Sequence, residues 1–239
     1  PLSMIFQKSF DEGKLSDDWK LANISSIFKK GQKIKPENYR PVSLTSVPSK
    51  IMESIIQDQV ICELDKVDFY SQPQHGFING RSTLKNLLET IESWTRILDK
   101  GYGLDVAYLD FRKAFDKVSH KKLLEKMHRY GFRGKIFDWI KEFLASRKMR
   151  VHVNGKHSRW YEVMSGIPQG SVIGPLLFLI FVNELPEWVK SSIKMFADDT
   201  KMWTSIAKLD DEKELQSDIN RVVEWAQRWL LEFNKLNVR

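Results

Sequence analysis

The sequence predicts an α+β fold in which strands and helices are mixed along the chain. Helical spacing and strand alternation follow one another irregularly, without the repeated strand–helix–strand order of a doubly wound sheet. The 239 residues are 42% hydrophobic and 12% aromatic, which is enough for a sizeable core. No repeat, low-complexity tract or Gly/Ser linker marks a domain boundary.

The first hundred residues predict three helices and one strand. Leu2, Ile5, Phe6 and Phe10 have helical spacing, and Gly13 is placed to end that helix. Residues 19–28 then form a strand that leads into a basic turn. Two longer helices follow, and we expect the apolar stripe of each to be buried. These stripes are Ile51, Met52, Ile55, Ile56 and Val60 in the first, and Leu84, Leu87, Leu88, Ile91, Trp94 and Leu98 in the second.

A strand over residues 104–111 opens the second part of the chain, with Val106, Tyr108 and Asp110 on one face. Alternation, helical spacing and turn residues then predict the remaining elements in order. They are helices near 119–130 and 134–145, a hairpin over 149–163 that turns at Asn154-Gly155, an apolar helix over 171–184, a hairpin over 192–204 broken by Asp198-Asp199, and an amphipathic helix over 211–233.

The charge balance favours a polyanionic partner without proving one. The chain has 38 Lys and Arg against 31 Asp and Glu, a net charge of +7. Such an excess suits nucleic acid, although it also serves simply to keep a surface soluble. One cysteine excludes an internal disulfide, and the apolar run over 176–182 is too short to span a bilayer, so we expect no membrane partner. Because the chain opens at Pro1 and stops abruptly, we expect it to be part of a longer protein.

Three carboxylates break the pattern of an ordinary core. Asp110 falls where a strand would normally place an apolar residue, and Asp198-Asp199 separates two apolar strands. If these elements share one sheet, the three carboxylates gather at one end of it. Such a cluster raises its own pKa values unless cations neutralise it, and Mg²⁺ prefers oxygen ligands. Two such ions about 3.5–4 Å apart can clamp the attacking and leaving oxygens of a phosphoryl transfer.

Taken singly, these residues have ordinary explanations. An Asp-Asp pair in a hairpin is commonly turn chemistry, and an Asp at a strand end is usually a cap or a surface residue. Neighbouring motifs shift the balance. They are the run Tyr108-Leu109-Asp110-Phe111-Arg112-Lys113-Ala114-Phe115-Asp116, the loop Ser165-Gly166-Ile167-Pro168-Gln169-Gly170-Ser171, the turn Phe196-Ala197-Asp198-Asp199, and upstream the segments 19–31, 38–44, 75–77 and 80–82.

In this order and spacing, the motifs resemble those of reverse transcriptases, in particular the jockey-like branch of non-LTR (LINE-type) retrotransposons. The resemblance implies a right-hand polymerase fold. Residues 1–103 would be the fingers with a leading helix. Residues 104–239 would be the palm, an antiparallel sheet backed by helices, with a helical and hairpin insertion at 118–160 near the fingers. A C-terminal thumb and an endonuclease domain would be missing.

The resemblance also implies an RNA-directed DNA polymerase that extends a primer 3′-hydroxyl with dNTPs on an RNA template by two-metal nucleotidyl transfer. Asp110, Asp198 and Asp199 would be the catalytic residues and would bind two Mg²⁺ ions, for which Mn²⁺ could substitute. The nucleotide would contact Arg40, Lys29, Lys30, Phe111, Phe115, Gln169 and Gly170. The RNA template and DNA primer would contact Arg81, Gly166, Pro168 and Phe196.

Two of these implied roles have a clear physical reason. The ring of Phe115 would exclude a 2′-hydroxyl and so select deoxynucleotides. Arg40 would grip the triphosphate through the planar fork of its guanidinium.

One motif departs from the family pattern, and two other functions stay open. The fourth palm motif has Phe233-Asn234, but Asn237 stands where the family has Lys, which leaves Lys235 as a possible substitute. A group II intron-encoded protein of the same fold is one alternative. A repurposed remnant that binds RNA or protein without turnover is the other. Nuclear action is implied solely by the class of element.

Overall fold

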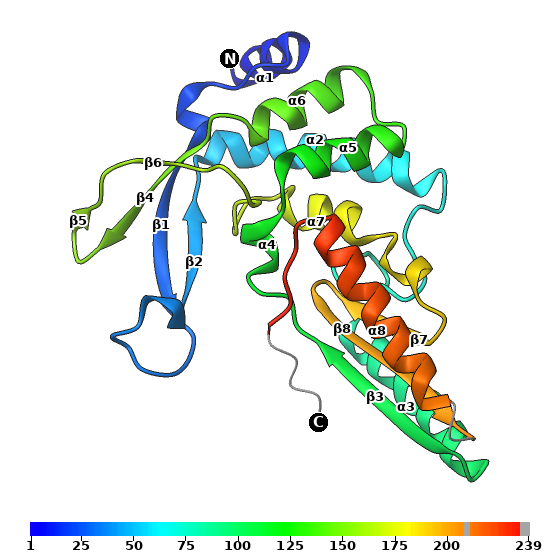
Figure 1. The fold of residues 1–239 in the computed structure, drawn as a ribbon. Coiled ribbons are helices and arrows are strands. Elements are labelled where there is room, and N and C mark those ends of the chain that lie inside the picture. The colour runs from blue at the N-terminus through cyan, green and yellow to red at the C-terminus, as the bar shows by residue number, and fades with distance from the viewer. Residues whose placement is uncertain (208–210, 235–239) are drawn as a thin grey trace. The chain divides into compact units, whose positions relative to one another are not determined.

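The computed structural model describes residues 1–207 and 211–234, and the chain divides into two compact units that are each α+β (Figure 1). Unit 1 comprises Pro1–Val67 and Ser119–Leu177, and unit 2 comprises Asp68–Val118 and Phe178–Arg239. Each unit is therefore built from two separate stretches of the chain. This division is one of packing, and the predicted boundary between fingers and palm at residue 103 stays a prediction.

Unit 1 contains a mixed sheet of five strands. They are β1 (Leu21–Phe28), β2 (Tyr39–Leu44), β4 (Lys148–Val153), β5 (Lys156–His157) and β6 (Tyr161–Glu162). Their order is β2-β1-β4-β5, with β6 also paired to β4. β1 and β2 are antiparallel, with Ile27 opposite Arg40, whereas β1 and β4 are parallel. The predicted turn at Asn154-Gly155 is confirmed, because both residues have the positive φ that a two-residue type I′ hairpin requires.

Unit 1 also contains α-helices and two 3₁₀ turns. They are α1 (Leu2–Glu12), α2 (Val47–Asp65), α5 (His120–Arg129), α6 (Gly134–Leu144) and the first part of α7 (Gly174–Val182), with 3₁₀ turns η1 (Asp17–Lys20) and η2 (Pro36–Asn38). Gly13 ends α1 in the left-handed conformation, as predicted. The strand predicted from residue 19 begins later, at Leu21, because the preceding 3₁₀ turn buries Trp19.

The predicted core stripe of α2 is wrong at one edge. Met52, Ile56 and Val60 are buried as expected, but Ile51 and Ile55 are exposed. The buried face of α2 is rotated away from the predicted one. It includes two polar side chains, Ser49 and Glu53, which are both fully buried.

Unit 2 contains an antiparallel sheet of three strands between helices. The strands are β3 (Gly103–Leu109), β7 (Ser192–Phe196) and β8 (Asp199–Ile206), in the order β3-β8-β7. The helices are α3 (Thr83–Asp99), α4 (Ala114–Lys117), the rest of α7 and α8 (Asp211–Arg228), with the 3₁₀ turn η3 (Leu185–Trp188). α8 covers one face of the sheet and α3 the other (Figure 1).

α8 confirms the predicted amphipathic helix, although it ends at Arg228 rather than 233. Its predicted inward residues Leu215, Ile219, Val222 and Ala226 are buried, as is Trp229 just beyond its end.

The predicted core stripe of α3 is wrong except at Trp94, which is half-buried and meets the Trp203 ring at 6.1 Å. Its aliphatic residues Leu84, Leu87, Leu88, Ile91 and Leu98 are all exposed. The face that meets the sheet is instead polar. Asn86 Nδ2 donates to the Met195 carbonyl at 3.1 Å, and Trp203 Nε1 donates to Ser93 Oγ at 3.1 Å. The helix therefore packs through hydrogen-bonding groups and the Trp94 ring, and leaves its aliphatic residues exposed.

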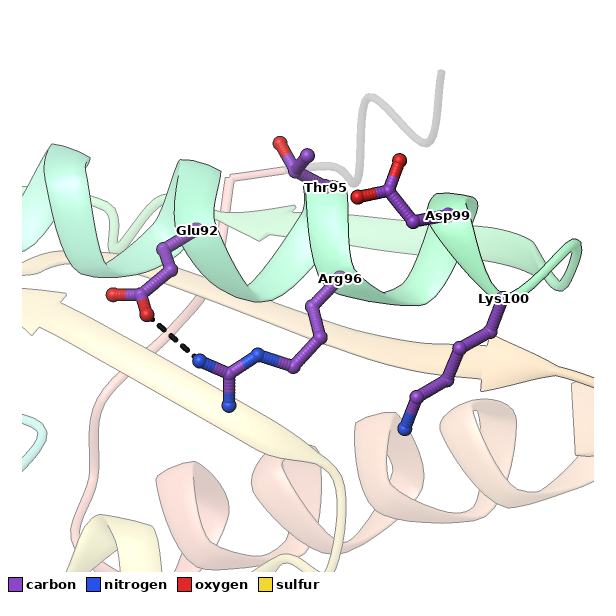
Figure 2. A pocket seen from close by; sticks show the side chains of 5 residues that line it. All are labelled: Glu92, Thr95, Arg96, Asp99 and Lys100. Carbon is purple, nitrogen blue, oxygen red and sulfur yellow. Dashed lines mark hydrogen bonds and ion pairs between the residues drawn. The ribbon is translucent and has the colours of Figure 1, made fainter.

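A shallow pocket of about 520 Å³ lies along α3, lined by Glu92, Thr95, Arg96, Asp99 and Lys100 (Figure 2). Within it, Arg96 Nη2 pairs with Glu92 Oε1 at 2.7 Å. All five lining residues belong to the last turns of this one helix, and none is a predicted site residue. In the part of the chain that the structure describes, no helix is long and apolar enough to cross a membrane.

Candidate active site

The sheet of unit 2 brings the three predicted carboxylates to one end. Leu109, the last residue of β3, pairs with Thr200 of β8, so Asp110 continues toward the level of Asp199. Asp199 in turn pairs with Phe196, which leaves Ala197 and Asp198 as the two residues of the turn. Asp110 and Asp199 are exposed and Asp198 is half-buried.

The chemistry of these donors fits a magnesium ion. Among residues 1–207 and 211–234, no three acidic, histidine or cysteine side chains converge closely enough to hold an ion as they stand. The three aspartates nevertheless offer oxygen ligands alone, at one end of one sheet, and two of them face solvent. This is the donor type that Mg²⁺ and Mn²⁺ accept, and it excludes a thiolate or imidazole site there.

Gln74 clamps the turn that carries Asp198. Its side-chain Oε1 accepts from the backbone N–H groups of Ala197 and Gly76, both at 2.8 Å, and its Nε2 donates to the Ala197 carbonyl at 3.2 Å. Gln74 is buried, and Ala197 has a positive φ of 56°. The approach is so close that a Cβ on Gly76 would lie 2.3 Å from the Ala197 nitrogen. Sequence reasoning missed Gln74, because its partners are backbone groups and leave no pattern of residue types.

Arg81 supports the same loop. Its Nη1 donates to the carbonyls of Ser71 at 2.7 Å and Gln74 at 2.6 Å. The guanidinium thus holds the segment from which Gln74 reaches the turn. The predicted contact of Arg81 with template or primer stays a prediction.

Asp110 has a side-chain partner from the end of the described chain. Asn234 Nδ2 donates to Asp110 Oδ2 at 2.8 Å, and the Asn234 N–H donates to the Asp110 carbonyl, also at 2.8 Å. The residues next to this pair, Phe111 and Phe233, stack with their ring centroids 4.4 Å apart, and Phe111 is buried. Because the Phe111 ring is buried, the predicted contact of Phe111 with nucleotide would have to be made by its backbone. Lys235 and Asn237 of the fourth motif lie outside the described residues.

The ring of Phe115 is held in place by two other aromatic rings. Its ring stacks on Phe178, with centroids 4.4 Å apart and planes 22° apart, and meets the edge of Phe77 at 6.4 Å. The side chain is half-buried, so part of the ring remains accessible. Such stacking favours a single ring orientation.

The predicted phosphate-binding cations lie in unit 1, on the β1–β2 hairpin. Lys29 and Lys30 follow β1, and Arg40 lies in β2. All three are exposed. Within the described residues, none of them forms an ion pair. The hairpin itself is closed by the Lys29 N–H, which donates to the Asn38 carbonyl at 2.9 Å.

The loop with Gln169 also belongs to unit 1, and its backbone is tied down at several points. The Gly166 carbonyl lies 2.7 Å from His120 Nε2, and the Gln169 carbonyl accepts from the Ser43 N–H at 2.7 Å. Pro168 closes a turn, because its carbonyl accepts from the Ser171 N–H at 3.1 Å and from Ser171 Oγ at 2.8 Å.

Gly170 allows the loop to lie close to β2. It has a φ of +107°, and a Cβ there would lie 3.0 Å from the Ser43 carbonyl oxygen.

Comparison with solved structures shows the fold of the chain. The chain matches a telomerase from Candida tropicalis in complex with a fragment of telomeric RNA, with a TM-score of 0.64 and 13% identity, covering 98% of this chain and 43% of that chain. An apo telomerase from the same organism gives a TM-score of 0.59, also at 13% identity, over 98% of this chain and 55% of that chain. At this identity the likeness shows the fold alone, which is that of the right-hand polymerases.

Sequence comparison then gives the family: the chain belongs to the reverse transcriptases, since the family model "Reverse transcriptase (RNA-dependent DNA polymerase)" matches residues 27–236. In Drosophila melanogaster it is 31% identical to the RNA-directed DNA polymerase from mobile element jockey, over 98% of this chain and 26% of that protein. It is also 31% identical to the probable RNA-directed DNA polymerase from transposon X-element, over 90% of this chain and 24% of that protein. The resemblance to the jockey-like group is confirmed, and the chain spans about a quarter of the length of these relatives.

Proposed function

We propose that this chain carries the polymerising centre of a non-LTR retrotransposon reverse transcriptase, which extends a primer 3′-hydroxyl with dNTPs on an RNA template. The observation that carries the proposal is the register of the unit 2 sheet. It places Asp110 at the same end as the Asp198–Asp199 turn, in a chain of this family.

The three aspartates are proposed to hold the divalent ions. Asp110 and Asp198 would bind both ions, with Asp199 as a nearby ligand or electrostatic support. Two magnesium ions bound there would lower the pKa of the primer hydroxyl and neutralise the leaving pyrophosphate. Asn234 fixes one oxygen of Asp110 through its hydrogen bond, and Gln74 fixes the turn that presents Asp198. The first contact orients the Asp110 carboxylate, and the second holds the backbone next to Asp198.

The nucleotide is proposed to contact cationic, loop and aromatic residues. Arg40 would bind the triphosphate through two parallel N–H donors, and Lys29 or Lys30 would add a second positive charge. Gln169 and Gly170 would contact the nucleotide through the tied loop. Phe115, held by Phe178, would exclude the 2′-hydroxyl of a ribonucleotide.

Template and primer are proposed to bind mainly through their phosphates. Arg81, Gly166, Pro168 and Phe196 would contribute contacts, and the net charge of +7 supports binding that does not depend on base sequence. In this proposal residues 1–103 act as the fingers and residues 104–239 as the palm.

Primer extension on a poly-rA/oligo-dT template tests the proposal. We expect the chain to incorporate dTTP with Mg²⁺ or Mn²⁺, and the Asp198→Asn variant to show background incorporation. Asp105→Asn is the matched control, because Asp105 is an exposed aspartate of the same sheet, on β3 well before Asp110. Incorporation by Asp198→Asn at the wild-type rate would refute the assignment. Tight RNA binding by a folded chain that extends no primer would favour the remnant without turnover.

A further inference from the structure

Glu53 is a buried acid that has no part in the roles described so far. It lies in the middle of α2, and its side chain is fully buried in unit 1. An acid in this position costs free energy unless its oxygens are hydrogen-bonded. Its contacts therefore indicate what holds it there.

Both oxygens of Glu53 accept hydrogen bonds, and one of them binds the backbone just after the Gly166–Gly170 loop. Oε2 accepts from the N–H of Val172 at 2.7 Å and from the N–H of Ile173 at 3.4 Å. Oε1 accepts from Ser49 Oγ one turn earlier on the same helix, at 3.1 Å. The sequence separation from Glu53 to Val172 is 119 residues. This one carboxyl group thus joins α2 to the segment between Gln169 and α7.

The pKa of Glu53 reflects its burial and its hydrogen bonds. Burial raises the pKa of Glu53, while the N–H groups of Val172 and Ile173, the Ser49 hydroxyl and the nearby Arg147 cation oppose that rise. Arg147 is itself buried, donates to the Phe143 carbonyl at 3.1 Å, and has its pKa lowered by burial to about 10. Burial outweighs the cation and the donors, so the pKa of Glu53 stays above its ordinary value, and the hydrogen bonds reduce the cost of placing the acid in the interior.

The other end of the loop is tied independently. Gln169 is held to Ser43 of β2 by its carbonyl, and Gly166 is held to His120. Glu53 supplies the anchor on the C-terminal side, three residues beyond Gln169. Without it, the backbone between Gly170 and α7 would lose its contact with α2, and two buried N–H groups would lack a partner.

We infer that Glu53 is a positioning residue for nucleotide binding, which sets the Gly166–Gly170 loop, and with it Gln169, by anchoring the loop to α2 through Val172 and Ile173. The inference rests on the proposed role of Gln169 in binding the incoming nucleotide. It assigns to Glu53 no contact with substrate or metal.

The test combines kinetics with a measurement that needs no activity. Glu53→Ala should raise the KM for dTTP about tenfold, because the loop then holds Gln169 in its binding position in a smaller fraction of the molecules, with rates normalised to the active fraction. Glu53→Gln keeps an oxygen acceptor for the Val172 N–H and should recover most of the wild-type KM. Glu53→Asp, one methylene shorter, should behave like Glu53→Ala.

Ile56→Val is the matched control for lost stability. Ile56 lies one turn further along α2, is equally buried, and has no hydrogen bond to the loop. Its variant should lower the thermal midpoint without changing KM. If Ile56→Val raises KM as Glu53→Ala does, the effect is one of stability and the inference is wrong.

Amide hydrogen exchange of the segment 166–173 gives the second readout. In Glu53→Ala, exchange there should rise above the change seen in Ile56→Val. A raised exchange with an unchanged KM, or an unchanged exchange, would refute the inference. If wild-type protein incorporates no nucleotide at all, the proposed function fails, and exchange still shows whether Glu53 holds the loop.

Discussion

At the residue scale, the bond between Asn234 and Asp110 has the most direct chemical consequence. Asn234→Ala removes the donor to Asp110 Oδ2 and frees the carboxylate to rotate. We expect the Mg²⁺ concentration for half-maximal primer extension to rise about tenfold, as for other groups that orient a metal ligand. Because Asn234 is exposed, the thermal midpoint should change little.

Asn220→Ala is a suitable control for that measurement. Asn220 is also exposed and accepts a side-chain hydrogen bond, from Gln216 on α8. Its variant should leave the Mg²⁺ titration unchanged. An unaltered Mg²⁺ titration in Asn234→Ala would show that Asn234 does not orient a metal ligand.

Gly76 supports a second prediction at this scale. Gly76→Ala places a methyl group 2.3 Å from the Ala197 nitrogen, so the turn with Asp198 must move. We expect a loss of about 1–3 kcal/mol in the free energy of unfolding, together with a large loss of primer extension. Gly103→Ala, whose Cβ would meet the Ile206 side chain at 3.3 Å, should cost less of both. Denaturant titration and primer extension of the two variants decide the matter.

A candidate site residue was predictable from the sequence where a charged side chain stood in an apolar segment. Asp110 and Asp198-Asp199 stood out because carboxylates interrupt apolar strands. Gln74 and Glu53 did not, although both are buried and both hold backbone N–H groups. A backbone donor has no residue type, and its partner here is more than a hundred residues away. No local pattern could report such a contact.

At the element scale, α2 and α3 invite a direct comparison. Ile56→Ala in α2 removes a fully buried side chain and should cost about 2–5 kcal/mol in the free energy of unfolding. Ile91→Ala in α3 is the same substitution on an exposed residue and should change it by less than about 0.5 kcal/mol. Denaturant titration measures both. A large cost at Ile91 would mean that its helix face is covered in solution.

The same comparison explains which elements could be predicted. Apolar spacing located both helices, but it cannot tell which face the rest of the chain covers. In α3 the covered face bears Asn86, whose side chain donates to the Met195 carbonyl of the sheet, and Thr90, whose hydroxyl donates to the Asn86 carbonyl within the helix. Hairpins such as the one turning at Asn154-Gly155 were predictable from local turn chemistry. The parallel pairing of β1 with β4 was not, since it joins distant segments.

At the scale of the whole molecule, the half-buried His120 makes the free energy of unfolding depend on pH. Burial lowers the pKa of His120, outweighing the raising effect of its bond to the Gly166 carbonyl. The folded state therefore favours the neutral ring. That contribution is complete above pH 6.5, the ordinary pKa, and is lost as pH falls through the lower folded value.

We therefore expect the free energy of unfolding to fall on acidification from about pH 7 to pH 5, the range in which histidine titrates. His120→Gln, which keeps a donor for the Gly166 carbonyl, should make that fall shallower. Urea titrations at several pH values measure the slope for each protein. Identical slopes would show that His120 does not contribute, leaving His75, whose pKa burial also lowers.

The two compact units have a consequence for inheritance. The chain passes from one unit to the other after Val67, after Val118 and after Leu177, so each unit is encoded by two separated stretches of the gene. A single crossover between related elements therefore cannot exchange one unit without dividing the other: after Val67 it keeps unit 2 whole but divides unit 1, and after Leu177 it keeps unit 1 whole but divides unit 2. It joins half of a unit from one parent to half from the other. Chimeras of these elements should fold where the two parents share the contacts that join the two stretches of a unit. Where the parents differ in those contacts, recombination should exchange both units together.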